Sequence, residues 1–150
     1  MQHTRRLRAS PQLRAFLALA PLLAVLIAAC GGASSPAPSP VDLQGTTWRA
    51  ILIRDAAPVI GAEPTIRFDG GQAGGTTGCN SYGGAFHVGD GGAFRMDAMS
   101  MTEMACAEPR GAQEGVVMDI LSHADHLQLV DGQLRISGPS GSITFAEDPR

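Results

Sequence analysis

The chain has 150 residues, of which 44% are hydrophobic, and all 11 of its basic residues other than His are Arg. This length holds one modest hydrophobic core. Four Arg lie within residues 1–29, so the remainder has seven Arg against fourteen acidic residues, a formal charge of −7. Such an acidic domain argues against binding of nucleic acid and against electrostatic adhesion to anionic lipid.

Residues 1–29 have the pattern of a secretory signal peptide. Three Arg occur within the first eight residues, and an apolar run over 15–29 follows. This run is shorter than a membrane-spanning helix. It ends in "LIAAC", which resembles the bacterial lipobox. This resemblance implies cleavage before Cys30 and attachment of acyl chains such as palmitate to that cysteine, and two or three such chains anchor a protein firmly. The alternative is an ordinary signal peptide with an incidental cysteine.

Residues 31–40 contain only Gly, Ala, Ser and Pro. With Cys30 they are predicted to form a disordered tether between the membrane and the folded domain. Gly31, rather than Asp, follows the cysteine. By resemblance to the sorting rule of Gram-negative lipoproteins, this favours the outer membrane facing the periplasm. In a cell without an outer membrane, the expected location is the outer face of the cytoplasmic membrane.

Residues 41–147 are predicted to form one domain, and 148–150 a short tail. The first predicted strand, 46–54, places Trp48, Ala50 and Leu52 on one side. The second, 64–69, alternates with Ile66 and Phe68 inward. Residues 69–75, "DGGQAGG", read as a turn because of their glycines.

Further short strands are predicted over 76–80, 82–88, 93–96 and 99–105, with a turn at 89–92. Gly83 and Gly84 suggest a β-bulge or a close backbone approach. One helix is predicted over 109–124, with Pro109 in its first turn and with Glu108 and Glu114 toward its positive end. Its expected inward stripe is Ala112, Val116, Val117, Ile120, Leu121 and Ala124.

Three more strands, at 126–130, 134–137 and 142–147, are separated by "DGQ" and "GPSG" turns. The pattern is strands, one helix and more strands. It predicts an α+β, mostly β fold, in which a curved or barrel-like antiparallel sheet packs against a single helix.

Cys79 and Cys106 remain as a pair once Cys30 is assigned to the lipid anchor. In an oxidising compartment, an even pair favours a disulfide. Two free thiols and a redox or metal pair are the alternatives, although the spacing is not that of a CxxC motif. Asn80 and Thr102 lie nearby in the sequence, where their side chains can cap buried backbone groups.

Three sequence motifs resemble the META domain, the family of the heat-shock protein HslJ. They are a Leu-x-Gly-x-x-Trp start, a Gly-Cys-Asn turn followed by an aromatic residue, and Thr-x-Met-Ala-Cys before a helix that contains a glutamate. The matching residues are Leu43, Gly45, Trp48, Gly78, Cys79, Asn80, Tyr82, Thr102, Met104, Ala105, Cys106 and Glu114. Glu103 departs from the Arg that many members carry there.

The resemblance implies a small exported or lipid-anchored protein linked to stress resistance, motility or virulence. We expect a non-catalytic envelope protein without a cofactor, which acts through a protein partner. The sequence leaves open whether the surface around Asn80, Tyr82 and Glu103 contacts that partner. One alternative function is inhibition of an exogenous lysozyme or protease, which the acidic surface would suit.

Metal or lipid binding is another alternative. Met96, Met99, Met101 and Met104 lie within nine residues, and thioethers bind Cu(I); His87 would add a nitrogen ligand. Methionine is also a common core filler, and we expect these four side chains to pack in the core beside the cysteine pair. A lipid cavity inside the curved sheet is a further possibility. No Ser, His and Asp arrangement for nucleophilic catalysis is evident in the sequence.

Overall fold

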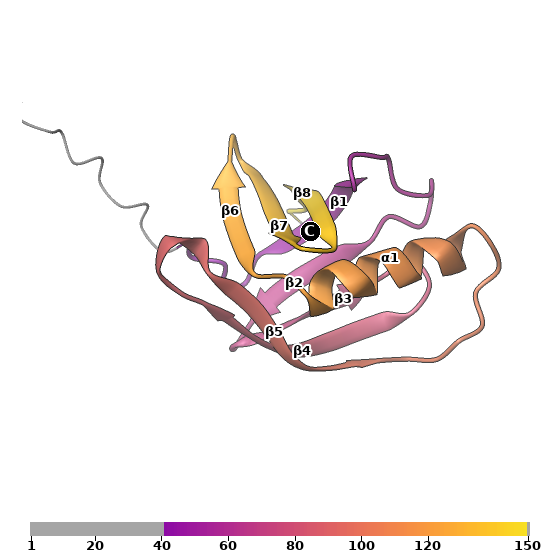
Figure 1. Cartoon of the computed structure of the whole chain (residues 1–150), viewed down its shortest axis with the longest axis horizontal. Helices are drawn as coiled ribbons and strands as arrows, with labels where there is room; N and C mark the ends of the chain where they lie inside the picture. The colour runs from indigo at the N-terminus through magenta and orange to yellow at the C-terminus, as the bar shows by residue number, and fades with distance from the viewer. Residues whose placement is uncertain (1–40, 150) are drawn as a thin grey trace, which may run out of the picture. The chain divides into compact units, whose positions relative to one another are not determined.

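The computed structural model describes residues 41–149, so Cys30 and the predicted signal peptide and tether lie outside the described residues. These residues form a sheet of eight strands, one 3₁₀ turn (η1) and one helix (Figure 1). The elements are β1 (Thr47–Ile53), β2 (Thr65–Asp69), β3 (Gln72–Thr76), β4 (Ser81–Val88), η1 (Asp90–Gly92), β5 (Phe94–Met101), α1 (Arg110–Ser122), β6 (His126–Val130), β7 (Gln133–Gly138) and β8 (Gly141–Glu147).

The strands are antiparallel to their neighbours, in the order β5-β4-β3-β2-β1-β8-β7-β6. The sheet curls so that its two edge strands meet at one end, where Ala93 forms a bridge with His126. There the Phe94 N–H donates to the Asp125 carbonyl at 2.9 Å. Helix α1 lies across one face and contacts β5, β7 and β8 (Figure 1). The predicted curved antiparallel sheet with one packed helix is confirmed.

Alternation in β2 follows the prediction, but β1 departs from it. Ile66 and Phe68 are fully buried, whereas Arg67 between them is exposed. In β1, the pairing with β8 shifts register between Ala50 and Leu52. An extra residue at such a bulge reverses the sides of the residues that follow. The prediction that Leu52 faces inward is therefore wrong: it is 37% exposed, and Ile53 is buried in its place.

The turn predicted over 69–75 is also wrong. The chain reverses within Asp69–Gln72, where Gly70 and Gly71 have positive φ, and then continues as β3 between β2 and β4. Gly74 is extended, and a Cβ there would lie 2.7 Å from the Tyr82 carbonyl oxygen. Some glycines of this segment therefore permit close strand packing rather than a turn. The irregularity predicted at Gly83–Gly84 is confirmed by a register shift between Gly83 and Ala85.

Helix α1 differs from its prediction at the first turn. It begins at Arg110, after Pro109, and ends at Ser122. Ala112 is exposed, and Gln113 is buried with Val117, Ile120 and Leu121. The inward face therefore holds a glutamine where an alanine was expected. Among residues 41–149, no helix is long and apolar enough to cross a membrane.

The core lies between α1 and the inner face of the sheet. The methionines of β5 and the following loop divide between this core and the surface. Met96 is buried and Met99 packs against the core, but Met101 is 36% exposed and Met104 is 61% exposed. The expectation that all four fill the core is wrong for the last two, because β5 ends at Met101 and the chain then leaves the sheet.

Candidate functional site

A cluster of hydrogen-bonded polar side chains, three of them buried, joins the β3–β4 loop, the segment after β5 and the start of α1. We call it the Asn80 cluster, and its members are Thr77, Asn80, Thr102, Gln113 and Glu114. Thr77 and Asn80 are 0% and 1% exposed, so each of their polar groups needs a partner. No buried side-chain nitrogen or oxygen within the described residues lacks a hydrogen bond.

Asn80 uses all four hydrogen-bonding positions of its amide. The Nδ2 group donates to the Met104 carbonyl at 3.0 Å and to Glu114 Oε1 at 3.1 Å. The Oδ1 atom accepts from the Thr102 hydroxyl and from the Met104 N–H, both at 2.8 Å. One side chain thereby fixes the backbone after β5 in place of a strand partner.

Glu114 connects α1 to the β3–β4 loop. Its Oε2 accepts from the Thr77 hydroxyl at 2.7 Å and from the Asn80 N–H at 3.1 Å. The groups that donate hydrogen bonds to the Glu114 carboxylate are the Thr77 hydroxyl and two N–H groups of Asn80, and all of them are neutral. Hydrogen bonds to a carboxylate are stronger than those between neutral groups, so this contact is a firm link between helix and sheet.

Gln113 ties a third segment to the same place. Its Nε2 donates to the carbonyls of Ala62 at 2.8 Å and Thr77 at 3.0 Å, and its Oε1 accepts from the Val59 N–H at 2.7 Å. Gly78 has a φ of 93°, and a Cβ there would collide with the Ala62 carbonyl oxygen. A glycine is therefore required where the β3–β4 loop passes the β1–β2 loop.

Cys79 and Cys106 form a disulfide beside this cluster, with Cα atoms 6.1 Å apart. Both cysteines are partly exposed. They line a surface hollow of about 360 Å³ whose walls include Met104, Glu108 and Pro109. The predicted disulfide is thus present, and it closes the loop that carries β4 and β5.

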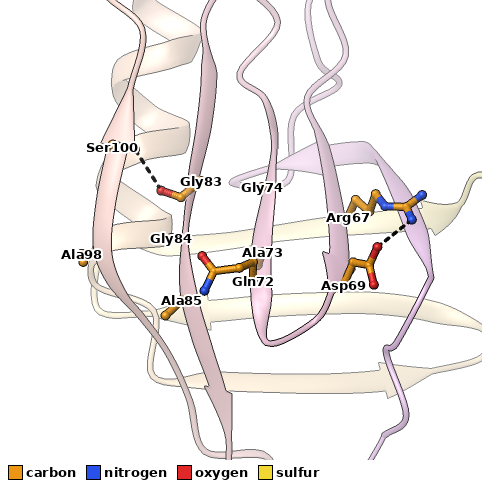
Figure 2. Close-up of a pocket in the computed structure, with 10 residues that line it drawn as sticks. All are labelled: Arg67, Asp69, Gln72, Ala73, Gly74, Gly83, Gly84, Ala85, Ala98 and Ser100. Carbon is orange, nitrogen blue, oxygen red and sulfur yellow. Dashed lines mark hydrogen bonds and ion pairs between the residues drawn. The ribbon is translucent and has the colours of Figure 1, made fainter.

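A second feature is an open groove of about 610 Å³ over β2, β3, β4 and β5, which we call the outer groove. Figure 2 shows α1 behind these strands, so the groove lies on the face turned away from the helix. Its lining residues are mostly small, and they are Arg67, Asp69, Gln72, Ala73, Gly74, Gly83, Gly84, Ala85, Ala98 and Ser100.

The outer groove has only backbone and small side chains at its floor, and two of its three glycines, Gly74 and Gly84, pack closely against neighbouring strands. A Cβ on Gly84 would lie 2.6 Å from the Asp97 carbonyl oxygen. Gly83 differs: a Cβ there would have its nearest neighbour, the Ala73 carbonyl oxygen, at 3.7 Å. At one rim, Arg67 Nη2 lies 3.0 Å from Asp69 Oδ2 (Figure 2). Bare backbone flanked by an ion pair can receive a side chain from another molecule.

The model of the META domain family matches residues 41–149. The chain belongs to the META domain family. Among curated proteins, none matches the sequence.

Solved structures similar to this META domain show the same fold. A protein from Burkholderia xenovorans, solved by NMR, has a TM-score of 0.56 and 24% identity over 80% of this chain and 97% of its own. A second NMR structure has a TM-score of 0.59 and 22% identity over 69% and 90% of the two chains. A DUF4847 family protein from Bacteroides vulgatus has a TM-score of 0.52 and 12% identity over 73% and 96%.

The META motif residues fall into two groups. Gly78, Asn80, Thr102, Met104 and Glu114 meet at the Asn80 cluster, together with the disulfide. The start motif lies elsewhere: Leu43 and Trp48 are core residues, 3% and 4% exposed, and Gly45 has a φ of 74° and donates its N–H to the Phe68 carbonyl at 2.8 Å.

Two META motif residues that were candidates for a partner surface are buried. Tyr82 is 6% exposed, its hydroxyl donates to the Thr65 carbonyl at 2.9 Å, and burial raises the pKa of its phenol above the usual value. Asn80 is likewise enclosed. Of the proposed surface, Glu103 is exposed, and Ala105 beyond it is exposed as well.

Sequence reasoning missed Thr77 and Gln113. A spacing of 113, 117, 120, 121 and 124 fits an inward helical face as well as the predicted stripe does, and it would have placed Gln113 in the META domain core. Thr77 adjoins a positive-φ glycine, where a hydroxyl bonds to the following backbone: its Oγ1 accepts from the Asn80 N–H at 3.0 Å.

Proposed function

We propose that this protein is a lipid-anchored, non-catalytic envelope protein that supports stress resistance by binding a protein partner through the outer groove. The observation that carries the proposal is the groove itself, an exposed hollow lined mostly by Gly, Ala and Ser. The family motif residues support this choice indirectly. Most of them have their polar groups bonded within the domain, so they are not available to a partner.

Charge indicates the kind of partner. The domain that follows the predicted signal carries a formal charge of −7. Asp97, near the groove, is contacted by His87 at 3.2 Å and Arg95 at 3.0 Å, and Asp69 is contacted by Arg67. Exchange of such surface ion pairs costs little. A suitable partner would therefore present a flat side chain, which packs on the floor of the outer groove, surrounded by basic residues that pair with the acidic residues of the domain.

A groove-filling variant tests this proposal. Gly83→Val adds a side chain at the floor position where a Cβ has ordinary contacts, so we expect the fold to tolerate it. Ser81→Val is the matched control, because Ser81 is exposed on the same strand but does not line the groove. Both variants are introduced into a strain that lacks the native protein, and survival under envelope stress is measured together with cross-linked partners.

We expect Ser81→Val to restore survival and to retain the cross-link, and Gly83→Val to lose both while remaining at normal abundance. Restoration by Gly83→Val would contradict a role for the groove.

The anchor is tested separately by mass spectrometry of the mature protein. We expect a chain that begins at Cys30 with added acyl mass, and a further gain of two hydrogen atoms on reduction of the remaining pair. An unmodified Cys30 would contradict the lipid anchor, without bearing on the groove.

A further inference from the structure

The disulfide lies against a carboxylate in a way that its stapling role does not require. The two sulfur atoms of Cys79 and Cys106 and a carboxylate oxygen of Glu114 all lie within 4.8 Å of one another. Cys106 Sγ lies 3.9 Å from Glu114 Oε1. Two potential thiolates and one carboxylate therefore converge on a single point beside the surface hollow.

We propose that reduction of this disulfide creates a Zn²⁺ site formed by Cys79, Cys106 and Glu114. Zinc binds thiolates and carboxylates in tetrahedral geometry, and its usual bond lengths place ligand atoms about 3.6–3.8 Å apart. The sulfur–carboxylate distance already approaches this value, and the two sulfurs separate once the bond between them is broken. The fourth position faces the hollow, where water can fill it.

The step balances with a dithiol as the reductant. Two electrons and two protons pass from the dithiol to the sulfurs of Cys79 and Cys106, and the reductant becomes a disulfide. Zinc then binds the two sulfurs as thiolates and releases two protons to solvent. The hollow of about 360 Å³, lined by both cysteines, is the path by which the reductant and the ion reach the sulfurs.

Asn80 lies close enough to donate to a thiolate, and one of its two present Nδ2 hydrogen bonds, to the Met104 carbonyl or to Glu114 Oε1, would be exchanged for it. Asn80 Nδ2 lies 3.4 Å from Cys106 Sγ and 3.9 Å from Cys79 Sγ, and N–H donors of this kind stabilise negative charge on thiolate ligands. Glu114 is oriented by hydrogen bonds from Thr77 and Asn80 to its Oε2 atom. Its Oε1 atom accepts from Asn80 Nδ2 at 3.1 Å and lies 3.9 Å from Cys106 Sγ.

Zinc titration of the full chain tests the proposal. Every sample carries Cys30→Ala, which removes the third cysteine, and is held in mild detergent. One sample is reduced and freed of reductant without oxygen, and the other keeps its disulfide. Zn²⁺ is titrated against a chromophoric chelator, and Co²⁺ is added separately to detect thiolate-to-cobalt absorption. We expect the reduced chain to bind one equivalent at least about 100-fold more tightly than the oxidised chain.

Two carboxylate variants separate a defined site from two thiols acting alone. Glu114→Gln is expected to weaken zinc binding by about tenfold or more. Glu108→Gln is the matched control, since Glu108 lines the same hollow but does not belong to the converging group, and we expect it to bind as the parent does. Cys106→Ala, which keeps Glu114 and its hydrogen bonds, is expected to lose stoichiometric binding and the cobalt band.

Circular dichroism confirms that each variant is folded before titration. If Glu114→Gln is unfolded, the comparison of reduced chain, oxidised chain and Cys106→Ala decides the outcome. Equal binding by the reduced and oxidised chains, or unchanged binding in folded Glu114→Gln, would overturn the proposal. Neither outcome depends on the outer groove, so the proposed function is judged separately.

Discussion

The Asn80 cluster and the outer groove both involve β3–β5 and their loops, and the cluster also includes Gln113 and Glu114 of α1. The two regions use polar groups in opposite ways. In the cluster, side chains from three segments bond to one another, and Asn80 alone makes four hydrogen bonds. In the groove, the floor is backbone and small side chains, open to solvent. Several META motif residues belong to the Asn80 cluster, whereas none lines the outer groove.

This difference explains why a recognisable motif does not by itself indicate an activity. Motif residues such as Asn80 and Gly78 are needed because a loop without strand partners must be held against β4 and α1. The outer groove depends instead on positions that carry little or no side chain.

Removal of the disulfide should have the largest effect. In the chain-entropy model, a loop of 28 residues is worth about 3.5 kcal/mol. We expect Cys79→Ser/Cys106→Ser to lower the free energy of unfolding by about that amount. Urea unfolding followed by the fluorescence of Trp48, the one tryptophan of the chain, measures it. A loss below about 1 kcal/mol would show that the cluster holds this loop without the staple.

Asn80→Ala should cost nearly as much. The change leaves three partly buried groups, the Met104 N–H and carbonyl and the Glu114 carboxylate, without their amide partner. An unpaired buried group costs about 1–3 kcal/mol, and partly buried groups lie at the low end of this range. We expect a loss of about 3 kcal/mol in urea unfolding. The control, Ser81→Ala, changes an exposed neighbour, and its loss should stay within about 0.5 kcal/mol.

The adjacent glycines Gly83 and Gly84 should respond differently to the same methyl group. Gly84→Ala places a Cβ 2.6 Å from the Asp97 carbonyl oxygen, and overpacking of this kind costs about 2 kcal/mol. Gly83→Ala meets nothing closer than 3.7 Å, so its stability should change by less than about 0.5 kcal/mol. Equal thermal shifts for the two variants would contradict the assignment of Gly83 to an open floor.

Tyr82→Phe should have a smaller effect at neutral pH than Gly84→Ala, about 1 kcal/mol, because it removes one hydrogen bond to the Thr65 carbonyl. Burial raises the pKa of Tyr82 in the folded state. The folded protein therefore holds this proton more tightly than the unfolded chain does.

The contribution of Tyr82 to stability is thus complete below about pH 10 and falls as the pH rises above it. The chain has one Tyr and no Lys, so alkaline unfolding curves isolate this group. Between pH 10 and 11, the parent should lose stability and Tyr82→Phe should not. Parallel curves would contradict burial of the hydroxyl.

Several parts of the fold could be predicted because a single local rule decides them. Alternation placed Ile66 and Phe68 inward, and the apolar spacing after Pro109 located the helix. Leu52 was misplaced because a bulge depends on the partner strand, which the local pattern does not contain. Residues 72–75 were wrongly predicted as part of a turn because glycine occurs both in turns and where strands pack closely, and only the position of Tyr82 on the neighbouring strand distinguishes the two.

Some residues of the candidate site could likewise be predicted from the sequence, and others could not. The disulfide could be predicted because the signal pattern predicts an oxidising compartment, and the capping role of Asn80 because of its position beside Cys79. Gln113 was missed because a buried polar residue is identified by its partners on other segments, here the carbonyls of Ala62 and Thr77. The outer groove could not be predicted at all, since it arises from Gly74 and Gly83 lying side by side on paired strands.

The most direct test of this account is a double-mutant cycle in urea unfolding between Asn80→Ala and Glu114→Gln. If the motif residues form one bonded unit, the double variant should be less destabilised than the sum of the single variants, by at least about 1 kcal/mol. The same cycle between Asn80→Ala and Gly83→Val should give additivity within about 0.5 kcal/mol. Additivity in the first cycle, or strong coupling in the second, would contradict the division between a structural cluster and an open groove.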